Sequence, residues 1–306
     1  MTSHDPILVG VNGSRGSSAA IRYAASEADR LDTAVRLAHV TPNLVPLTPM
    51  FPIAPPDLEA AGREILYEAF EEARALLPPD RLTTVLLDGP RVAALLRAAE
   101  QARLVVIGHE RRSTMERLLT GSTLTGLAAR ADCPVVSVRE DWAQGQEHHC
   151  VLVGIKSTEH SAALVHRALE IAGARGARVV LVHAWSLPQE YDDLIASRTE
   201  LDEWAERARR SIERSLGDLR ETHPQVPIEV RVVHGQAARV LQRASEEADL
   251  LLLARRAHAF PFGHLGGTAR ALLHASLCPV EVVPPADAPV VDTSDLVLEQ
   301  SGMLKR

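Results

Sequence analysis

The chain has few aromatic residues, few cysteines and no long apolar segment. Aromatic residues make up 3% of its 306 residues and hydrophobic residues 46%, so we expect a core of alanine, valine and leucine. Three cysteines are too few for a disulfide framework, and Cys133 and Cys278, each followed by proline and an apolar run, are interpreted as buried core residues. No apolar run approaches the roughly 20 residues that span a bilayer, and the amino end lacks a signal-peptide pattern. We therefore expect a cytoplasmic protein with no membrane association.

Positive charge and the common catalytic motifs are also scarce. Lysine and arginine number 33 against 40 acidic residues, which gives a formal net charge of −7 and no overall field to attract nucleic acid. The phosphate-loop motif, the dinucleotide fingerprint and the nucleophile elbow of α/β-hydrolases are absent, and no Cys/His group has zinc spacing. Nucleic acid is therefore not an expected partner, and the chain is not expected to be an enzyme.

The sequence contains one pattern twice. Four segments of the first half recur in the same order in the second: ILVGVNGS (7–14) and VLVGIKS (151–157), RLAHV (36–40) and VLVHA (180–184), residues 86–108 and 232–254, and DCPVVSV (132–138) and LCPVEVV (277–283). Gly10 and Gly154 are separated by 144 positions, and the offset changes little along the chain. Such self-similarity indicates a duplicated domain. We predict a first domain at 1–140, a linker at 141–149, a second domain at 150–284 and a tail at 285–306.

Each half alternates short apolar runs with amphipathic stretches. The expected strands include Ile7–Val11, Leu104–Gly108 and Pro134–Val138, with equivalents at Val151–Ile155, Leu250–Ala254 and Pro279–Val283. The longer expected helices are Leu58–Leu77 and Ser197–Leu219. Strands that are apolar throughout and alternate with helices predict a parallel sheet covered on both faces, the doubly wound arrangement. Ligands bind such sheets at the carboxyl ends of the strands.

Two segments lie at that expected edge. The proline-rich stretch at 41–57 cannot be regular helix or central strand, and it is either a lid or a surface connection. After the fourth strand, Gly121-Ser122-Thr123 precedes a helix, where unpaired backbone amides favour an anion. The simpler alternative is that Gly121 ends a turn and Ser122 caps the helix. His39 and His183 end strands at matching positions and are interpreted as structural rather than as metal ligands.

The spacing around this loop resembles a known nucleotide signature. Gly108, two residues, Arg111, nine residues and Gly121-Ser122 are similar to the Gly-two-Gly-nine-Gly-Ser/Thr pattern of the universal stress protein family. The resemblance covers 7–138 and 151–283. It implies two tandem, doubly wound, five-stranded parallel-sheet domains of the adenine nucleotide alpha hydrolase-like fold. It also implies that the fifth strands, Pro134–Val138 and Pro279–Val283, pair about a pseudo-twofold axis, and that two chains form a homodimer.

The same resemblance implies roles for residues of the first domain. Backbone at Val40 would hold adenine, Gly108 would lie near the ribose, and Gly121, Ser122 and Thr123 would bind the phosphates of ATP. Asn12 stands where the family has an acidic residue, which leaves a role for Mg²⁺ open, and Arg111 replaces the middle glycine, where it either crowds the loop or pairs with phosphate. We expect a stress-response protein that binds ATP or a related adenine nucleotide and acts as a regulator without dedicated catalysis.

Other members of the family bind no nucleotide, so a scaffold or interaction protein is the alternative, and slow ATP hydrolysis is left open. The second domain departs further from the pattern. Ala254 and Ala257 replace the first two glycines, and Lys156 replaces the acidic position. Gly267 and Thr268 fit the nine-residue spacing, although the distance to Cys278 favours Gly266-Gly267 instead. Phe260 and Phe262 lie in the same loop. We predict that this half is degenerate and serves as a structural partner.

Overall fold

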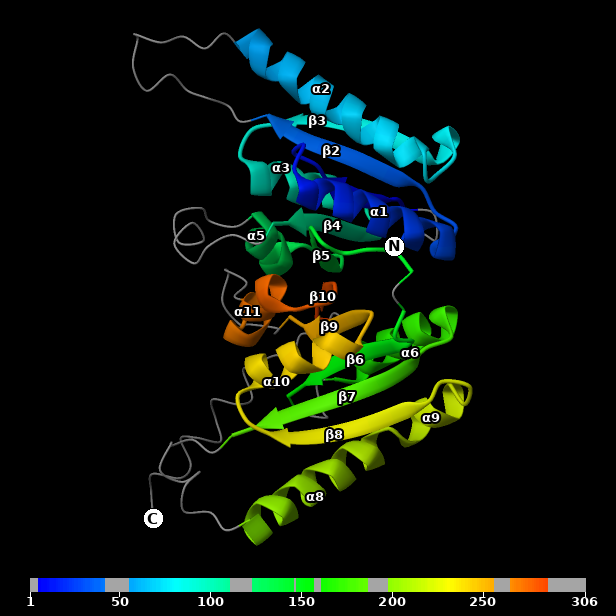
Figure 1. Cartoon of the computed structure of the whole chain (residues 1–306), viewed down its shortest axis with the longest axis vertical. Helices are drawn as coiled ribbons and strands as arrows, with labels where there is room; N and C mark the ends of the chain where they lie inside the picture. The colour runs from blue at the N-terminus through cyan, green and yellow to red at the C-terminus, as the bar shows by residue number, and fades with distance from the viewer. Residues whose placement is uncertain are drawn as a thin grey trace, which may run out of the picture.

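The computed structural model describes residues 5–41, 55–110, 123–145, 147–156, 161–186, 198–255 and 265–285. These residues build one ten-stranded sheet (Figure 1). In spatial order its strands are β3 (Leu82–Asp88), β2 (Val35–Thr41), β1 (Ile7–Gly10), β4 (Leu104–His109), β5 (Val135–Arg139), β10 (Val280–Val283), β9 (Leu250–Ala254), β6 (Cys150–Ile155), β7 (Arg178–Trp185) and β8 (Ile228–His234). Each half contributes five strands, and within each half all neighbouring strands are parallel.

The two halves meet through their fifth strands. β5 and β10 pair antiparallel, with Val280 opposite Ser137 and Val282 opposite Val135. This pairing confirms the prediction for the fifth strands and relates the two halves by a pseudo-twofold axis between β5 and β10. The sheet therefore runs without a break from one domain into the other.

Helices cover both faces of the sheet. They are α1 (Arg15–Leu31), α2 (Pro55–Arg74), α3 (Arg91–Ala99), α5 (Thr123–Arg130), α6 (Ala162–Arg175), α8 (Arg198–Ser215), α9 (Gly217–Thr222), α10 (Ala237–Ala244) and α11 (Gly267–Ala275), with short 3₁₀ turns η1 (Pro79–Arg81) and η2 (Ser245–Glu247). The single helix predicted at 197–219 is wrong in one respect, because α8 ends at Ser215 and α9 begins at Gly217. Glycine is a poor residue for a helix interior, which favours a break at this point.

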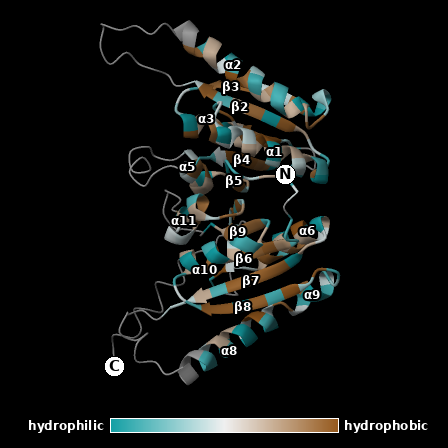
Figure 2. Cartoon of the chain, in the orientation of Figure 1, coloured by the Kyte–Doolittle hydropathy of each residue, from teal (hydrophilic) through white to brown (hydrophobic). Residues whose placement is uncertain are grey.

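The core has three parts. On one face, α1 with α2 and α6 with α8 enclose separate apolar clusters, one for each domain. On the other face a single cluster is continuous across the domain boundary and includes Leu127 of α5 and Leu272 of α11. Figure 2 shows hydrophobic strands between helices whose outer surfaces are more hydrophilic. The halves therefore share one core layer as well as one sheet.

The cysteines agree with a further expectation. Cys133 and Cys278 are buried free thiols, and burial raises the pKa of Cys133 to about 11 and that of Cys278 to about 12. The interpretation of both as core residues is confirmed. Within the part of the chain that the structure describes, no helix has the length and hydrophobicity needed to cross a membrane.

Candidate functional site

A cavity of about 270 Å³ lies at the carboxyl edge of the first domain's strands. β1 is flanked there by β2 and β4, whose connections leave in opposite directions, so the cavity lies at the point where the strand order reverses. Its described walls come from the ends of these three strands, the loop after β1, the starts of α3 and α5, and α11. The lining residues are Gly10, Val11, Asn12, Ser14, Ala38, His39, Val40, Arg91, Leu95, Ile107, Gly108, His109, Glu110, Thr123, Leu124 and His274.

The loop between β1 and α1 is fixed by its own side chains. Ser14 caps α1, because its hydroxyl accepts a hydrogen bond from the Ser17 backbone N–H. The Ser17 hydroxyl donates to Asn12 Oδ1 at 2.6 Å and accepts from the Asn12 backbone N–H at 2.9 Å. Asn12 therefore uses its side-chain oxygen to hold the loop in shape, and it brings no negative charge to the cavity.

A glycine pair brings α1 against the end of β4. A Cβ atom on Gly108 would lie 1.7 Å from the carbonyl oxygen of Gly16, and a Cβ atom on Gly16 would lie 2.8 Å from the backbone nitrogen of His109. Both obstacles are backbone atoms, which cannot rotate away as the end of a side chain can. Gly108 therefore has a packing role, besides lining the cavity, that the nucleotide signature does not reveal.

The structure brings three of the sequence-predicted binding residues to this cavity. Val40 at the end of β2, Gly108 in β4 and Thr123 at the start of α5 all line it. Gly121, Ser122 and Arg111 lie outside the described residues. The remaining two predicted residues belong to the second domain, where Gly267 and Thr268 are the first residues of α11 and Gly266 is its N-cap.

The two strand-end histidines have equivalent bonds. His39 Nδ1 lies 2.8 Å from the carbonyl oxygen of Val11, and His183 Nδ1 lies 3.3 Å from that of Ile155. Because a carbonyl oxygen only accepts, each Nδ1 is the donor. Each ring thus ties its strand to the end of the neighbouring strand.

Sequence reasoning missed the histidine pair beside the cavity. His109, at the end of β4, meets His274 of α11 edge to face, with ring centroids 5.6 Å apart. His109 Nδ1 also lies 3.0 Å from the hydroxyl of Ser137, which donates to the Leu273 carbonyl at 2.7 Å. The contacts of His109 with His274 and of Ser137 with Leu273 cross the domain boundary between residues more than 130 positions apart, and no local spacing marks them as neighbours.

The equivalent edge of the second domain carries an aromatic cluster. Trp185, at the end of β7, stacks on Trp204 of α8 with centroids 6.3 Å apart and packs against His234 at 4.7 Å. The guanidinium of Arg207 lies 5.2 Å from the Trp204 ring centroid, a cation–π distance. The sequence did not indicate this cluster, because its members come from two strands and a helix.

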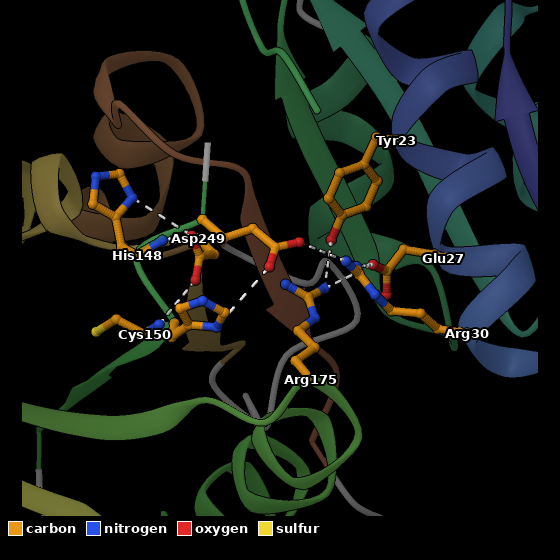
Figure 3. Close-up of polar contacts among 9 residues, drawn as sticks. Tyr23, Glu27, Arg30, His148, Cys150, Arg175 and Asp249 are labelled. Carbon is orange, nitrogen blue, oxygen red and sulfur yellow. Dashed lines mark hydrogen bonds and ion pairs between the residues drawn. The ribbon is translucent and has the colours of Figure 1, made fainter. Parts of the chain in front are cut away.

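A polar cluster joins the domains on the face of the sheet that α1 and α6 cover. Arg175 of α6 contacts Glu27 of α1 at 2.9 Å, and both side chains are about nine-tenths buried (Figure 3). Arg30 pairs with Glu27 at 2.7 Å, and Arg175 also reaches the hydroxyl of Tyr23. Burial and the nearby Glu27 carboxylate raise the pKa of Tyr23.

The linker is held beside this cluster by one carboxylate. Asp249 accepts hydrogen bonds from the backbone N–H groups of His148 and Cys150, at 2.6 and 2.8 Å, as Figure 3 shows. The start of β6 is therefore tied to the start of β9. Together the two polar groups fix α1, α6 and the end of the linker relative to one another.

Comparison with known proteins identifies the family. The sequence model of the universal stress protein family matches residues 4–139 and 148–284. The chain belongs to the universal stress protein family. A universal stress protein of Mycobacterium tuberculosis strain H37Rv is 31% identical over 289 residues, which cover 90% of this chain and 96% of that protein. One from Mycolicibacterium smegmatis is 29% identical over 288 residues, covering 91% and 97%.

Solved structures agree on the fold. A universal stress protein from Archaeoglobus fulgidus superimposes with a TM-score of 0.71 at 15% identity and covers 93% of this chain and 98% of that one. A putative universal stress protein from Pseudomonas aeruginosa gives a TM-score of 0.55 at 16% identity, covering 92% and 94%. The predicted fold of two tandem, doubly wound parallel-sheet domains is confirmed.

Proposed function

We propose that this universal stress protein binds ATP, or a related adenine nucleotide, in the first-domain cavity and acts as a nucleotide-dependent regulator. One observation carries the proposal. The cavity lies where the strand order reverses and is lined by Val40, Gly108 and Thr123, residues to which the family pattern gives roles in binding. The volume of about 270 Å³ is just below the roughly 300–1,000 Å³ of small-molecule sites. It suits a nucleoside whose phosphates extend to the open rim.

The residues present offer contacts for each part of the ligand. The backbone of Val40 would hold the base, and Leu95 and Ile107 supply apolar wall. Thr123 begins α5, so its hydroxyl and the positive end of the helix dipole would meet phosphate. Arg91, exposed at the start of α3, would add positive charge at the rim.

Regulation without dedicated catalysis agrees with the chemistry of the walls. Among the described lining residues Glu110 is the only carboxylate, and Asn12 already uses its side-chain oxygen in the loop. These residues do not supply the paired carboxylates that would favour a tightly held Mg²⁺ ion. A bound nucleotide would act by favouring one conformation or assembly over another, which requires different affinities for the two states.

Native mass spectrometry of the freshly purified protein, followed by calorimetric titration with ATP, tests the proposal. We expect one adenine nucleotide per chain, because Lys156, Ala254 and the aromatic cluster alter the second domain's edge. Two per chain would contradict the degeneracy of the second domain. No co-purified nucleotide and no binding of added ATP would favour the alternative, a nucleotide-free scaffold of the same fold. The expected homodimer and cytoplasmic location stay predictions, and light scattering checks the first.

A further inference from the structure

The last turn of α11 in the second domain forms part of the first domain's cavity. His274 is among the lining residues, and its ring meets the edge of His109 at the end of β4. The antiparallel pairing of β5 and β10 brings this about, because it turns α11 opposite to α5 and places its carboxyl end beside the first domain's edge. In Figure 1 α5 and α11 lie next to each other across the domain boundary.

Hydrogen bonds hold this turn in place. The Leu273 carbonyl can only accept, so the Ser137 hydroxyl gives its proton to that oxygen at 2.7 Å. The same hydroxyl oxygen then accepts from His109, and the proton of that ring is assigned to Nδ1. Ser137 is buried in β5, next to the domain boundary. His274 therefore follows a residue that is anchored to the first domain's last strand.

Only the second domain supplies a histidine at this position of its helix. If the repeats are aligned on Cys133 and Cys278, the position equivalent to His274 is Ala129 in α5. The position in α5 that is equivalent to His274 therefore carries a methyl group and no hydrogen-bond donor. The imidazole, which comes from the second domain, therefore faces the edge of the first domain, which keeps the cavity-lining Gly108 and Thr123.

The arrangement of strands indicates which part of a ligand the imidazole faces. Val40 lies on β2 and His109 on β4, with β1 between them, which separates the two strands by about 10 Å. His274 enters from beyond β4, at the end of the cavity opposite Val40. A nucleotide with its base at Val40 would present its sugar and phosphates there, and an imidazole N–H donates well to phosphate oxygen.

We propose that His274 donates a hydrogen bond to the phosphates of the nucleotide, so that the second domain completes the first domain's site within one chain. This inference rests on the nucleotide binding proposed above. It gives the degenerate half a function in binding, as the source of one wall of the site, in addition to its pairing through β10.

The test compares ATP and adenosine binding by calorimetry in the full chain. The variants are His274→Ala and, as a matched control, Arg270→Ala, which truncates an exposed side chain of the same helix. We expect His274→Ala to weaken ATP about tenfold, the effect of losing one charge-assisted hydrogen bond, and adenosine less than about threefold. Arg270→Ala should leave both affinities unchanged. His274→Asn, which keeps a donor, should recover part of the loss.

Each other outcome has a distinct meaning. Equal losses for ATP and adenosine would show that His274 acts through packing, and the proposed contact would be wrong. Unchanged ATP affinity in His274→Ala would also overturn it while leaving nucleotide binding itself intact. A wild-type chain that binds neither compound would instead refute the proposed function. Thermal unfolding of each variant identifies any loss that comes from misfolding.

Discussion

The two domains keep the same sheet and differ at its carboxyl edge. Gly10 and Gly154 are equivalent, and a Cβ atom on either would meet a buried apolar side chain at 2.6–2.7 Å. Gly89 and Gly235 are also equivalent, and both turn the chain at positive φ after an edge strand. The glycines packed against core side chains and the glycines of the turns are therefore present in both domains.

The glycines at the carboxyl edge of the sheet are not present in both domains. Gly108 and Gly16 make a backbone contact in the first domain, whereas Ala254 occupies the position equivalent to Gly108. The N-cap Ser14 of α1 accepts a hydrogen bond from the Ser17 backbone N–H, whereas the N-cap Ser161 of α6 makes no equivalent capping bond. The sheet and the shared core therefore constrain both repeats, whereas the edge is constrained only in the domain for which we propose a ligand.

The ion pair between α1 and α6 has no equivalent in the other repeat. Glu27 and Arg175 are equivalent to Ile171 and Leu31 in the other repeat. We expect Glu27→Ala to lower the free energy of unfolding by about 3 kcal/mol, because it leaves Arg175 buried without its carboxylate. Urea denaturation followed by circular dichroism measures the loss.

Two variants sharpen this prediction. The double variant Glu27→Ile, Arg175→Leu places the equivalent apolar residues on both helices and should recover most of the stability. Glu59→Ala breaks an exposed pair with Arg63 in α2 and should cost less than about 0.5 kcal/mol. A double variant no more stable than Glu27→Ala would show that the ion pair is required at this site.

Gly108 and Ala254 occupy equivalent positions and distinguish the two edges, so each can be replaced by the other's residue. Gly108→Ala should cost about 2 kcal/mol and abolish nucleotide binding, because its Cβ would overlap the Gly16 carbonyl oxygen and push α1 away from β4. Ala254→Gly, the reverse change at the equivalent position, should cost less than about 1 kcal/mol. Urea denaturation and ATP titration of both variants measure the difference. Equal costs would mean that the glycine contact does not distinguish the domains.

The sequence predicted the fold better than the site. Apolar strands and the duplicated pattern determine the sheet, and the family resemblance supplied the pairing of β5 with β10. The contact between His109 and His274 depends on where two distant helix and strand ends meet, which no local pattern encodes. The stacked Trp185 and Trp204 were missed for the same reason. Two predicted phosphate ligands, Gly121 and Ser122, lie outside the described residues and stay predictions.

Substitution of the equivalent residues Thr123 and Thr268 tests which domain binds the nucleotide. Thr123→Ala should weaken ATP about tenfold if its hydroxyl meets phosphate at the start of α5. Thr268→Ala makes the same change in the first turn of α11 and should leave ATP affinity unchanged. Calorimetry measures the ATP affinity of each variant relative to that of the wild type. A loss in Thr268→Ala and none in Thr123→Ala would place the site in the second domain and reverse the comparison.

The smallest predicted effect concerns the feature in which the two domains agree. Cys133 and Cys278 are equivalent, and burial raises the pKa of both thiols from 9.0, to about 11 and about 12. The unfolded chain therefore loses these protons from about pH 9, whereas the folded chain keeps them to about pH 11. For each thiol, the free energy of unfolding should therefore fall by about 1 kcal/mol as the pH rises from 8 to 10.

Urea denaturation at the two pH values measures this loss, and Cys133→Ala and Cys278→Ala isolate each thiol. Both variants should lose less stability than the wild type between pH 8 and pH 10, by similar amounts, whatever the substitution costs at pH 8. Tyr23 also has a raised pKa, but its ordinary value near 10 places most of its effect above this range. If only one variant reduced the pH dependence, the thiols of Cys133 and Cys278 would not be equally buried. The core shared across β5 and β10 would then be less symmetric than the sheet.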